Sequence, residues 1–243
     1  MNLIIDVGNT FVKLAVFESD SLICKHNVKQ EDFSIQINTL RVKYPSIEKC
    51  IISSVGRLEK KSLDTIKRFY DVLILNADTK LPITNLYSTP RTLGVDRIAL
   101  VCAAVKKFPN KNILIIDAGT CITYDFLKSN KQYLGGAISP GMRIRYKSLN
   151  TLTANLPLLE TQAPKNITGT STEASIHSGV VYGILNEIDG AVDHYKTKYS
   201  DLTVILTGGD AKFLSNQLKS SIFANPNFLL EGLNFILQFN SNE

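Results

Sequence analysis

The sequence lacks the features that mark exported and membrane-spanning proteins. Its first residues hold no basic segment followed by an apolar run and a small-residue cleavage site, so no signal peptide is expected. No apolar stretch is long enough to span a bilayer. With 243 residues, 44% of them hydrophobic and 20% charged, the chain has the composition of a globular protein with one large domain or two small ones. A cytoplasmic enzyme or binding protein without a membrane partner is expected.

Clustered positive charge is also scarce, although the formal net charge is +5. The basic residues are scattered, apart from the run RIRYK at 143–147. A nucleic-acid-binding surface needs clustered Lys and Arg, usually interleaved with exposed aromatic side chains. A solvated helix face explains the run better, and no nucleic-acid partner is expected.

Metal-binding spacings of cysteine and histidine are missing as well. No C-x-x-C pair occurs, and the cysteines fall within otherwise apolar segments, which predicts buried reduced thiols rather than disulfides or zinc ligands. The histidines have no ligand-like spacing to one another or to a cysteine. The residues concerned are Cys24, Cys50, Cys102, Cys121, His26, His177 and His194.

What is present is an alternation of apolar strands and amphipathic helices, typical of an α/β protein. Strands are expected at 2–6, 11–17, 49–55, 71–76, 112–117, 121–127, 133–139 and 201–207. Helices are expected at 57–70, 94–108, 141–154 and 228–239, and a further helix after Gly208-Gly209. Pro140 can open the first turn of the helix at 141–154. A long helix is expected to begin at the capping-box spacing Thr170–Glu173 and to end at about Tyr195. Residues 77–93 and 155–170 are expected to be loops.

The beginnings of the two halves are similar. LIIDVGNTFVKLAV from Leu3 matches LIIDAGTCITYDFL from Leu114, with four consecutive identities and a shared glycine two residues later. Two convergent hairpins could give this likeness, but a duplication explains it better. We therefore expect two similar α/β domains, each opening with a β-hairpin, that face each other across a cleft.

The turns of these hairpins offer a way to bind phosphate. A P-loop and a Rossmann fingerprint are both absent. The turn Gly8-Asn9-Thr10 would instead present successive backbone N–H groups, and Lys13 could reach a phosphate as a point charge. Each turn alone is an ordinary hairpin turn. Asp6 and Asp117, at the ends of matching strands, would together surround a gap the size of a cation such as Mg²⁺.

Further motifs follow in a specific order along almost the whole chain. They are G-x-D-R at 94–97 within TPRTLGVDR, DAGTCITYD at 117–125, GGAISPG at 135–141, TANLP at 153–157, GTSTEASIHSG at 169–179 and the Gly208-Gly209-Asp210 turn. This set resembles the type III pantothenate kinases of bacteria, within the superfamily of actin, heat-shock ATPases and sugar kinases.

The resemblance implies a fold and an activity. The fold would be α/β, with two duplicated RNase H-like (actin-like ATPase) domains at 1–111 and 112–243, mixed sheets flanked by helices, and an interdomain nucleotide cleft. The activity would be ATP-dependent phosphorylation of pantothenate to 4′-phosphopantothenate, the first step of coenzyme A biosynthesis. The cofactors would be ATP, Mg²⁺ and a monovalent cation, K⁺ or NH₄⁺. The protein would be a homodimer, with pantothenate near the subunit interface.

The resemblance also implies a role for individual residues. Asp96 would be the catalytic proton acceptor, and Asp117 the ligand of the monovalent cation, with Asp6 beside Mg²⁺. The ATP site would comprise Asp6, Val7, Gly8, Asn9, Thr10, Phe11, Val12, Lys13 and Thr120. The pantothenate site would comprise Tyr87, Gly94, Val95, Asp96, Arg97 and Thr172. Position 121, often alanine in the family, is cysteine here.

Two other functions fit parts of the sequence. The chain could phosphorylate another small hydroxylated substrate, or it could be an actin-like nucleotide-binding regulatory protein. Asp96 and Arg97 beside a loop favour the kinase, because a binding module needs no base there. Alone, Asp96 would pass for a capping-turn residue. Gly179 and Gly183 leave one face of the long helix bare, for packing either within the chain or across a dimer interface.

Overall fold

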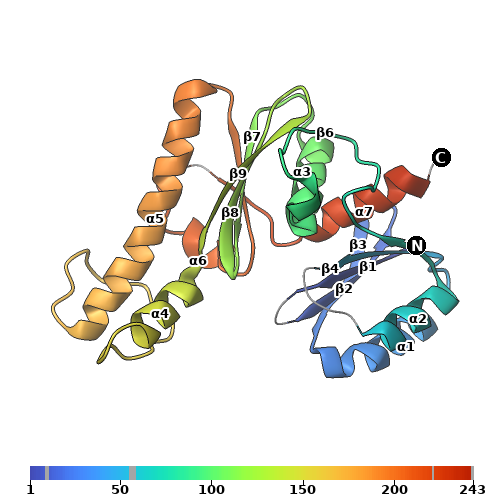
Figure 1. The fold of residues 1–243 in the computed structure, drawn as a ribbon, viewed down its shortest axis with the longest axis horizontal. Helices are drawn as coiled ribbons and strands as arrows, with labels where there is room; N and C mark the ends of the chain where they lie inside the picture. The colour runs from blue at the N-terminus through green and yellow to red at the C-terminus, as the bar shows by residue number, and fades with distance from the viewer. Residues whose placement is uncertain (9–10, 55–58, 221, 242–243) are drawn as a thin grey trace. The chain divides into compact units, whose positions relative to one another are not determined.

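The chain forms two compact units. The computed structural model describes residues 1–8, 11–54, 59–220 and 222–241. The first unit comprises Met1–Pro109, Lys131–Tyr133 and Asn227–Glu243, and the second comprises Asn110–Asn130 and Leu134–Pro226. Each unit is built on a sheet with helices against it (Figure 1).

The strands are β1 (Asn2–Val7), β2 (Val12–Glu18), β3 (Ser21–Val28), β4 (Lys49–Ser54), β5 (Asp71–Ile74), β6 (Thr84–Asn85), β7 (Ile113–Ala118), β8 (Cys121–Leu127), β9 (Gln132–Pro140), β10 (Thr203–Thr207) and β11 (Phe223–Ala224). The α-helices are α1 (Phe33–Lys43), α2 (Lys60–Phe69), α3 (Val95–Lys107), α4 (Met142–Thr151), α5 (Thr172–Lys198), α6 (Ala211–Ser215) and α7 (Phe228–Ser241). Short 3-10 helices lie at Gln30–Asp32 and Pro90–Thr92.

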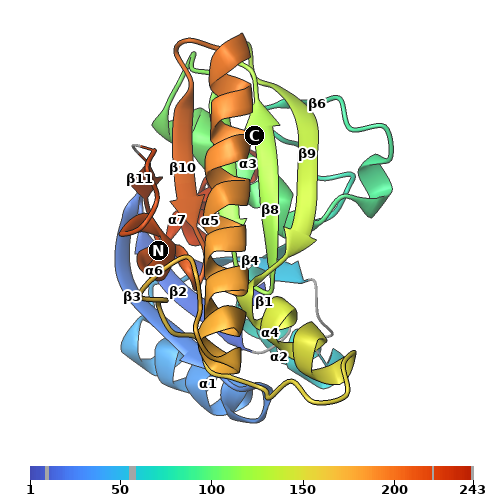
Figure 2. The same ribbon diagram turned by 90° about the vertical axis from the view of Figure 1, so that its left-hand side faces the viewer.

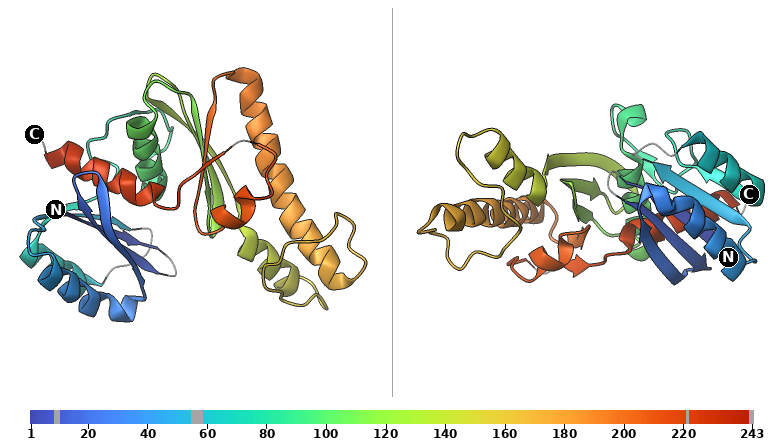
Figure 3. Two further views of the ribbon diagram at one scale, coloured as in Figure 1. Left: turned by 180° about the vertical axis from the view of Figure 1, so that it is seen from behind. Right: turned by 90° about the horizontal axis from the view of Figure 1, so that it is seen from below.

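The first unit contains a five-stranded mixed sheet in the order β3-β2-β1-β4-β5. β2 runs antiparallel to β1 and β3, whereas β1, β4 and β5 are parallel. Helices α1 and α2 bury Phe33, Ile37, Leu40 and Ile66 against one face of this sheet. α7 lies on the opposite face beside α3 (Figures 1 and 3). The apolar run of β1 is therefore buried on both faces, as a central strand requires.

The second unit contains the strands β11-β10-β7-β8-β9 of a mixed sheet. β7 runs parallel to β10 and antiparallel to β8. The first residues of β9, which belong to the first unit, also pair in parallel with β6. The 27-residue helix α5 crosses one face of the sheet (Figure 2) and packs Val181, Ile184 and Ile188 into a core with Leu114 and Leu206.

These elements confirm the predicted class of an α/β chain with two mixed sheets flanked by helices. The two matching segments both form hairpins, β1–β2 and β7–β8. In the corresponding registers Asp6 lies opposite Lys13 and Asp117 lies opposite Thr123. The division into two duplicated domains at 111/112 stays a prediction.

Some local predictions were wrong. The segment 77–93, expected to be a loop, contains β6 and a 3-10 turn, and the sequence-based assignment missed β3 and α1. α2 begins at Lys60 with Glu59 as its N-cap residue; the predicted start at 57 lies outside the described residues. Pro140 ends β9 instead of opening α4.

The start of α5 also differs from the predicted capping box. Ser171, not Thr170, is the N-cap residue, and its hydroxyl accepts a hydrogen bond from the Ala174 N–H at 3.2 Å. Glu173 therefore stands one position too early to complete the box. Among the cysteines, Cys50 and Cys102 are buried as expected and Cys24 is partly buried, but Cys121 is exposed.

Candidate active site

The first hairpin turn begins at Gly8, whose N–H donates a 3.1 Å hydrogen bond to the Phe11 carbonyl oxygen. A Cβ on Gly8 would lie 3.1 Å from that oxygen, so the close turn favours glycine. Asn9 and Thr10, predicted to bind ATP, lie outside the described residues. The Phe11 side chain is exposed, whereas Val7 and Val12 are buried in the hairpin beneath the turn.

The Asp6 carboxylate lies at the end of β1 and is almost completely buried. Lys13, directly opposite on β2, donates a 3.1 Å hydrogen bond to its Oδ2. Burial nevertheless raises the pKa of Asp6; Lys13 lowers it, and the neighbouring Asp96 carboxylate raises it further. The structure thus brings Asp6, Lys13 and Asp96 together within the first unit, and a charged Asp6 is costly in the free protein.

The Gly94–Arg97 motif forms the N-terminus of α3. Gly94 is the N-cap residue, and the Asp96 Oδ1 accepts a 2.9 Å hydrogen bond from the Arg97 N–H. A Cβ on Gly94 would overlap this same oxygen, so glycine leaves room for the carboxylate. Because the positive end of a helix dipole favours an anion, the position suits an ionised Asp96. Val95 is the first residue of the helix.

Arg97 and Tyr87 lie beside this helix end. The Arg97 side chain is buried, and its Cζ lies 5.6 Å from the centroid of the Tyr87 ring. Tyr87 in turn stacks on the fully buried Tyr133, with centroids 6.2 Å apart and planes inclined by 17°. This geometry is within the range of aromatic stacking and cation–π contact. The structure therefore brings Tyr87 to Arg97, and it adds Tyr133, a residue that no sequence motif singled out.

The second hairpin turn belongs to the second unit. The Gly119 N–H donates to the Cys121 carbonyl at 3.0 Å, and the Thr120 carbonyl accepts from the Gly141 N–H at 3.1 Å. A side chain at Gly141 would overlap the carbonyl oxygens of Gly119 and Thr120. The GGAISPG motif thus contacts the second hairpin turn at Thr120, through the N–H of Gly141.

The glycine turn after β10 lies against Asp117. Gly208 adopts a φ of +96°, which favours glycine, and a Cβ there would overlap the Asp117 Oδ1 and the Ala118 carbonyl oxygen. The Asp210 N–H donates to that same carbonyl oxygen at 3.0 Å. Burial raises the pKa of Asp210, while Arg143 lowers it. Asp117 and the Gly208-Gly209-Asp210 turn therefore meet within one unit.

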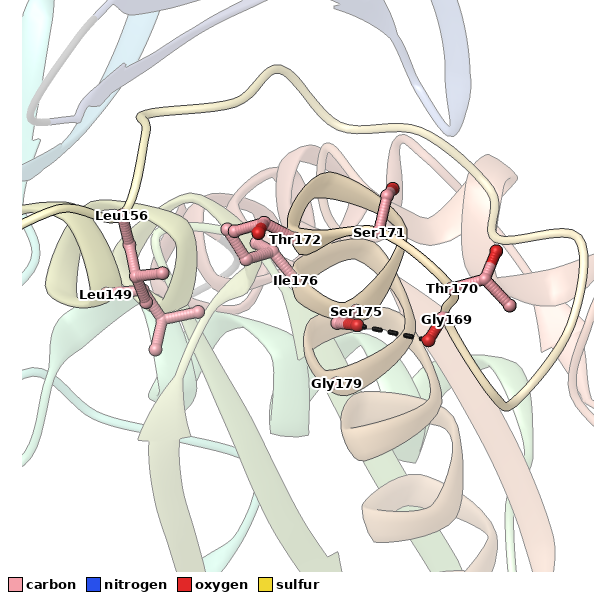
Figure 4. A pocket seen from close by; sticks show the side chains of 9 residues that line it. All are labelled: Leu149, Leu156, Gly169, Thr170, Ser171, Thr172, Ser175, Ile176 and Gly179. Carbon is pink, nitrogen blue, oxygen red and sulfur yellow. Dashed lines mark hydrogen bonds between the residues drawn. The ribbon is translucent and has the colours of Figure 1, made fainter.

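Thr172 lines a separate pocket of about 810 Å³ in the second unit (Figure 4). One part of its wall carries the hydroxyl groups of Thr170, Ser171, Thr172 and Ser175, and the Ser175 hydroxyl donates to the Gly169 carbonyl at 3.3 Å. Leu149, Leu156 and Ile176 make another part apolar, and Gly169 and Gly179 complete the lining. This combination suits a small ligand with both hydrogen-bonding groups and methyl groups.

The described residues contain neither a cluster of metal ligands nor a membrane-spanning helix. Over residues 1–8, 11–54, 59–220 and 222–241, no three His, Cys, Asp or Glu side chains gather closely enough to hold a metal ion. In the same ranges every helix is too short or too polar to cross a membrane.

Solved structures of similar architecture define the fold. A Baf family protein from Campylobacter jejuni has a TM-score of 0.67 at 23% identity and is matched over 99% of this chain and 100% of its own. A glucokinase from an Antarctic psychrotroph has a TM-score of 0.53 at 12% identity, with 98% of each chain covered. The (R)-2-hydroxyglutaryl-CoA dehydratase component A of Acidaminococcus fermentans also has a TM-score of 0.53, at 14% identity, with 98% and 96% covered. The fold is that of actin-like ATPases and sugar kinases.

Sequence comparison narrows the class to one family. Residues 2–194 match the sequence model of type III pantothenate kinases. A type III pantothenate kinase of Christiangramia forsetii is 52% identical over 100% of both chains, and one of Flavobacterium johnsoniae is 46% identical over 98% of both. The chain belongs to the type III pantothenate kinase family, whose members phosphorylate pantothenate in coenzyme A biosynthesis. The resemblance drawn from the motifs is confirmed.

Proposed function

We propose that this chain transfers the γ-phosphoryl group of ATP to the primary hydroxyl of pantothenate, and that the Asp96 carboxylate accepts the hydroxyl proton. The observation that carries the role of Asp96 is its position at the N-terminus of α3, with Oδ1 held by the Arg97 N–H at 2.9 Å. Phosphoryl transfer needs positioning, charge neutralisation and an acceptor for the proton. A carboxylate held at a helix N-terminus is oriented and lies at the positive end of the helix dipole, and so it can be that acceptor.

Arg97 and Tyr87 suit the recognition of the substrate. Pantothenate is an anion, and a guanidinium group can bind its carboxylate through two parallel hydrogen bonds. The contact with the Tyr87 ring restricts the Arg97 side chain, so less conformational entropy is lost on binding. Thr172 adds a hydroxyl group in a pocket that also offers leucine side chains for the methyl groups of pantothenate. Gly94 and Val95 would contribute backbone to the same substrate site.

The residues from Asp6 to Lys13 suit the phosphates of ATP. Lys13 supplies a positive charge beside the turn, and the backbone N–H groups of Asn9 and Thr10, which lie outside the described residues, would donate to the phosphates. Thr120 would contact ATP from the second hairpin. Asp6 would hold Mg²⁺, and the ion would supply positive charge to neutralise the phosphates of ATP. The fit of Mg²⁺ to Asp6 rests on the buried carboxylate, whose raised pKa shows that its charge is not fully compensated.

Asp117 would hold a monovalent cation, K⁺ or NH₄⁺. Its Oδ1 and the carbonyl oxygen of Ala118 both lie close to the position that a Cβ on Gly208 would occupy. Carboxylate and carbonyl oxygens are the ligands that hard cations prefer. These two oxygens support the proposed role of Asp117 as a cation ligand. A side chain at position 208 would overlap them, so the position requires glycine.

The protein would act as a homodimer in the cytoplasm. A Cβ added to Gly179 or to Gly190 on α5 would meet no atom of the described residues within 4 Å. Intrachain packing therefore does not account for the bare surface at Gly179, whereas a helix of a second copy could pack there. A kinase acting on another hydroxylated acceptor, and a nucleotide-binding regulator without catalysis, are the competing functions.

An assay of ADP release tests the proposal. Wild-type protein should consume ATP when pantothenate is present and should need K⁺ or NH₄⁺, so that Na⁺ does not replace them. Asp96→Asn should lower kcat roughly 100-fold or more, the usual contribution of a general base. Its KM for pantothenate should change much less, because Arg97 remains.

Asp64→Asn is the matched control, because Asp64 is exposed on α2 in the same unit. It should retain wild-type kinetics. ATP consumption without any dependence on pantothenate would favour another acceptor, and nucleotide binding without turnover would favour a regulator. Full activity of Asp96→Asn would reject Asp96 as the proton acceptor.

A further inference from the structure

Glu187, near the middle of α5, is the centre of a hydrogen-bonded network in the second unit. Its Oε1 accepts from the Tyr124 hydroxyl at 2.7 Å. Its Oε2 accepts from the Arg145 Nη2 at 2.5 Å and from the Ser139 hydroxyl at 3.1 Å. The network therefore joins β8, β9, α4 and α5 through one carboxylate.

The environment keeps this carboxylate charged. Partial burial alone would raise the pKa of Glu187, but the hydrogen bonds from Arg145, Tyr124 and Ser139 and the positive charge of Arg145 outweigh it and lower the pKa. The side chain of Arg145 is 21% exposed and that of Glu187 31%. Charge-assisted hydrogen bonds in such a partly buried site are stronger than those at an open surface.

Arg145 extends the network to the backbone of the GGAISPG motif. Its Nη2 donates to the Ser139 hydroxyl and its Nε to the Pro140 carbonyl oxygen, both at 2.9 Å. The guanidinium also packs beside Gly183, one helical turn before Glu187: a Cβ there would lie 3.6 Å from the Arg145 Nη1, an ordinary van der Waals distance. From α5, it is thus the hydrogen bond of Glu187 that holds the guanidinium in place.

The next contact reaches the second hairpin. The Gly141 N–H donates to the Thr120 carbonyl oxygen at 3.1 Å, and no side chain fits between them. A shift of the 139–141 backbone would consequently shift the turn at Thr120. Hydrogen bonds of the described residues thus lead from Glu187 through Arg145 and Pro140–Gly141 to the turn.

We propose that Glu187 is a positioning residue for ATP: through Arg145 it holds residues 139–141 against the hairpin turn that carries Thr120. The inference rests on the proposed function, since it takes this turn as part of the ATP site. Glu187 itself touches neither substrate. Its loss should therefore alter the use of ATP more than the use of pantothenate.

Glu187→Gln tests the inference, because glutamine keeps the shape of the side chain and removes its charge. The KM for ATP should rise roughly 2- to 30-fold, the range of couplings transmitted through one packed network. The affinity for a non-hydrolysable ATP analogue, measured by calorimetry, should fall by a similar factor. The KM for pantothenate should stay near the wild-type value.

Glu160→Gln is the matched control. Glu160 also pairs with an arginine of α4, Arg143 at 3.3 Å, but its side chain is 91% exposed. This variant should bind the analogue like the wild type. If Glu187→Gln also binds the analogue and uses ATP like the wild type, the positioning role is rejected.

Two more variants separate positioning from a loss of folding. Tyr124→Phe keeps the ring in the core and removes one hydrogen bond to Glu187, so it should raise the KM for ATP in the same direction but less. Arg145→Met should raise it as well, and the double variant with Glu187→Gln should be no worse than Arg145→Met alone. Additive losses would contradict the proposed path through Arg145.

The result that would reject the kinase function differs from the result that would reject the positioning role of Glu187. Wild-type protein that binds the ATP analogue but shows no pantothenate-dependent turnover would reject the proposed function. The comparison of analogue affinities between Glu187→Gln and Glu160→Gln would still decide whether Glu187 positions the nucleotide site.

Discussion

Asp6 shows how one residue can favour chemistry over stability. Its carboxylate is buried at the end of β1, with Lys13 as an ion-pair partner and Asp96 as a nearby like charge. The balance raises its pKa, so the free protein is less stable with this charge than without it. A bound cation or phosphate-bound metal would offset the free-energy cost of the buried Asp6 charge, so ligand binding should stabilise the folded protein.

Asp6→Asn should therefore make the free protein more stable while abolishing activity. In the wild type, the Asp6 carboxyl group binds a proton more tightly in the folded state than in the unfolded state, where its pKa is near 3.8. Wild-type stability consequently falls as pH rises from this value through the raised pKa, and the variant avoids that loss. At neutral pH its thermal midpoint should be higher by roughly 2–4 °C, about 1 kcal/mol for a chain of this length.

Thermal unfolding from pH 3 to pH 8 measures this difference. The advantage of Asp6→Asn should vanish in acid, where the wild-type carboxyl group is protonated as well. The exposed Asp64→Asn should show no such trend. A lower midpoint of Asp6→Asn at neutral pH would mean that its bond to Lys13 outweighs the cost of burial.

The residues that sequence reasoning found and those it missed differ in a physical way. Asp6, Asp96 and Asp117 each stand two positions from a glycine and close to an apolar segment, and such local patterns are visible in a sequence. Tyr133 and Glu187 act through partners 46 and 63 positions away, Tyr87 and Tyr124 respectively. Only the folded chain brings such pairs together, so a single sequence carries no signal for them.

At the scale of elements, the same limit explains which strands and helices were missed. β3 has alternating exposed and half-buried residues, and none of them is fully buried. α1 buries only Phe33, Ile37 and Leu40, while Ile35 and Val42 are exposed on its surface. Exposed apolar residues blur the helical period, and an outer strand lacks the long apolar run of a central one.

The contact between α3 and α7 carries a prediction at this scale. Gly232 of α7 lies so close to α3 that a Cβ would overlap the Ala99 carbonyl oxygen and come within 3.1 Å of the Ala103 Cβ. Gly232→Ala should push the helices apart and cost about 1–3 kcal/mol of stability, as overpacked cores do. Because α3 carries Asp96, kcat should fall as well.

Gly190→Ala is the control for Gly232→Ala, since a Cβ at Gly190 on α5 meets open space. Alanine favours a helix over glycine by up to about 1 kcal/mol, so this variant should be slightly more stable. Denaturant unfolding of both variants gives the two free energies. A neutral Gly232→Ala would show that the helices can separate without cost.

At the scale of the whole molecule, the proposed homodimer is the main expectation. Light scattering after gel filtration should give about twice the chain mass of 26.9 kDa. Gly179→Arg places a large charged side chain on the bare surface of α5 and should yield monomers that keep the helix content of the wild type by circular dichroism. A wild-type monomer, or a dimer unaffected by Gly179→Arg, would contradict the proposed interface.

The composition of the first unit has a consequence for how the protein is made. Its sheet is complete after β5, but α7, which covers one face and buries Leu230, Leu233 and Ile236, follows the second unit along the chain. The ribosome therefore releases the strands of this unit long before their covering helix exists, and an apolar surface stays open during synthesis of the entire second unit. Folding of the first unit cannot finish before the second unit has been synthesised and α7 has packed against α3, the helix that carries Asp96.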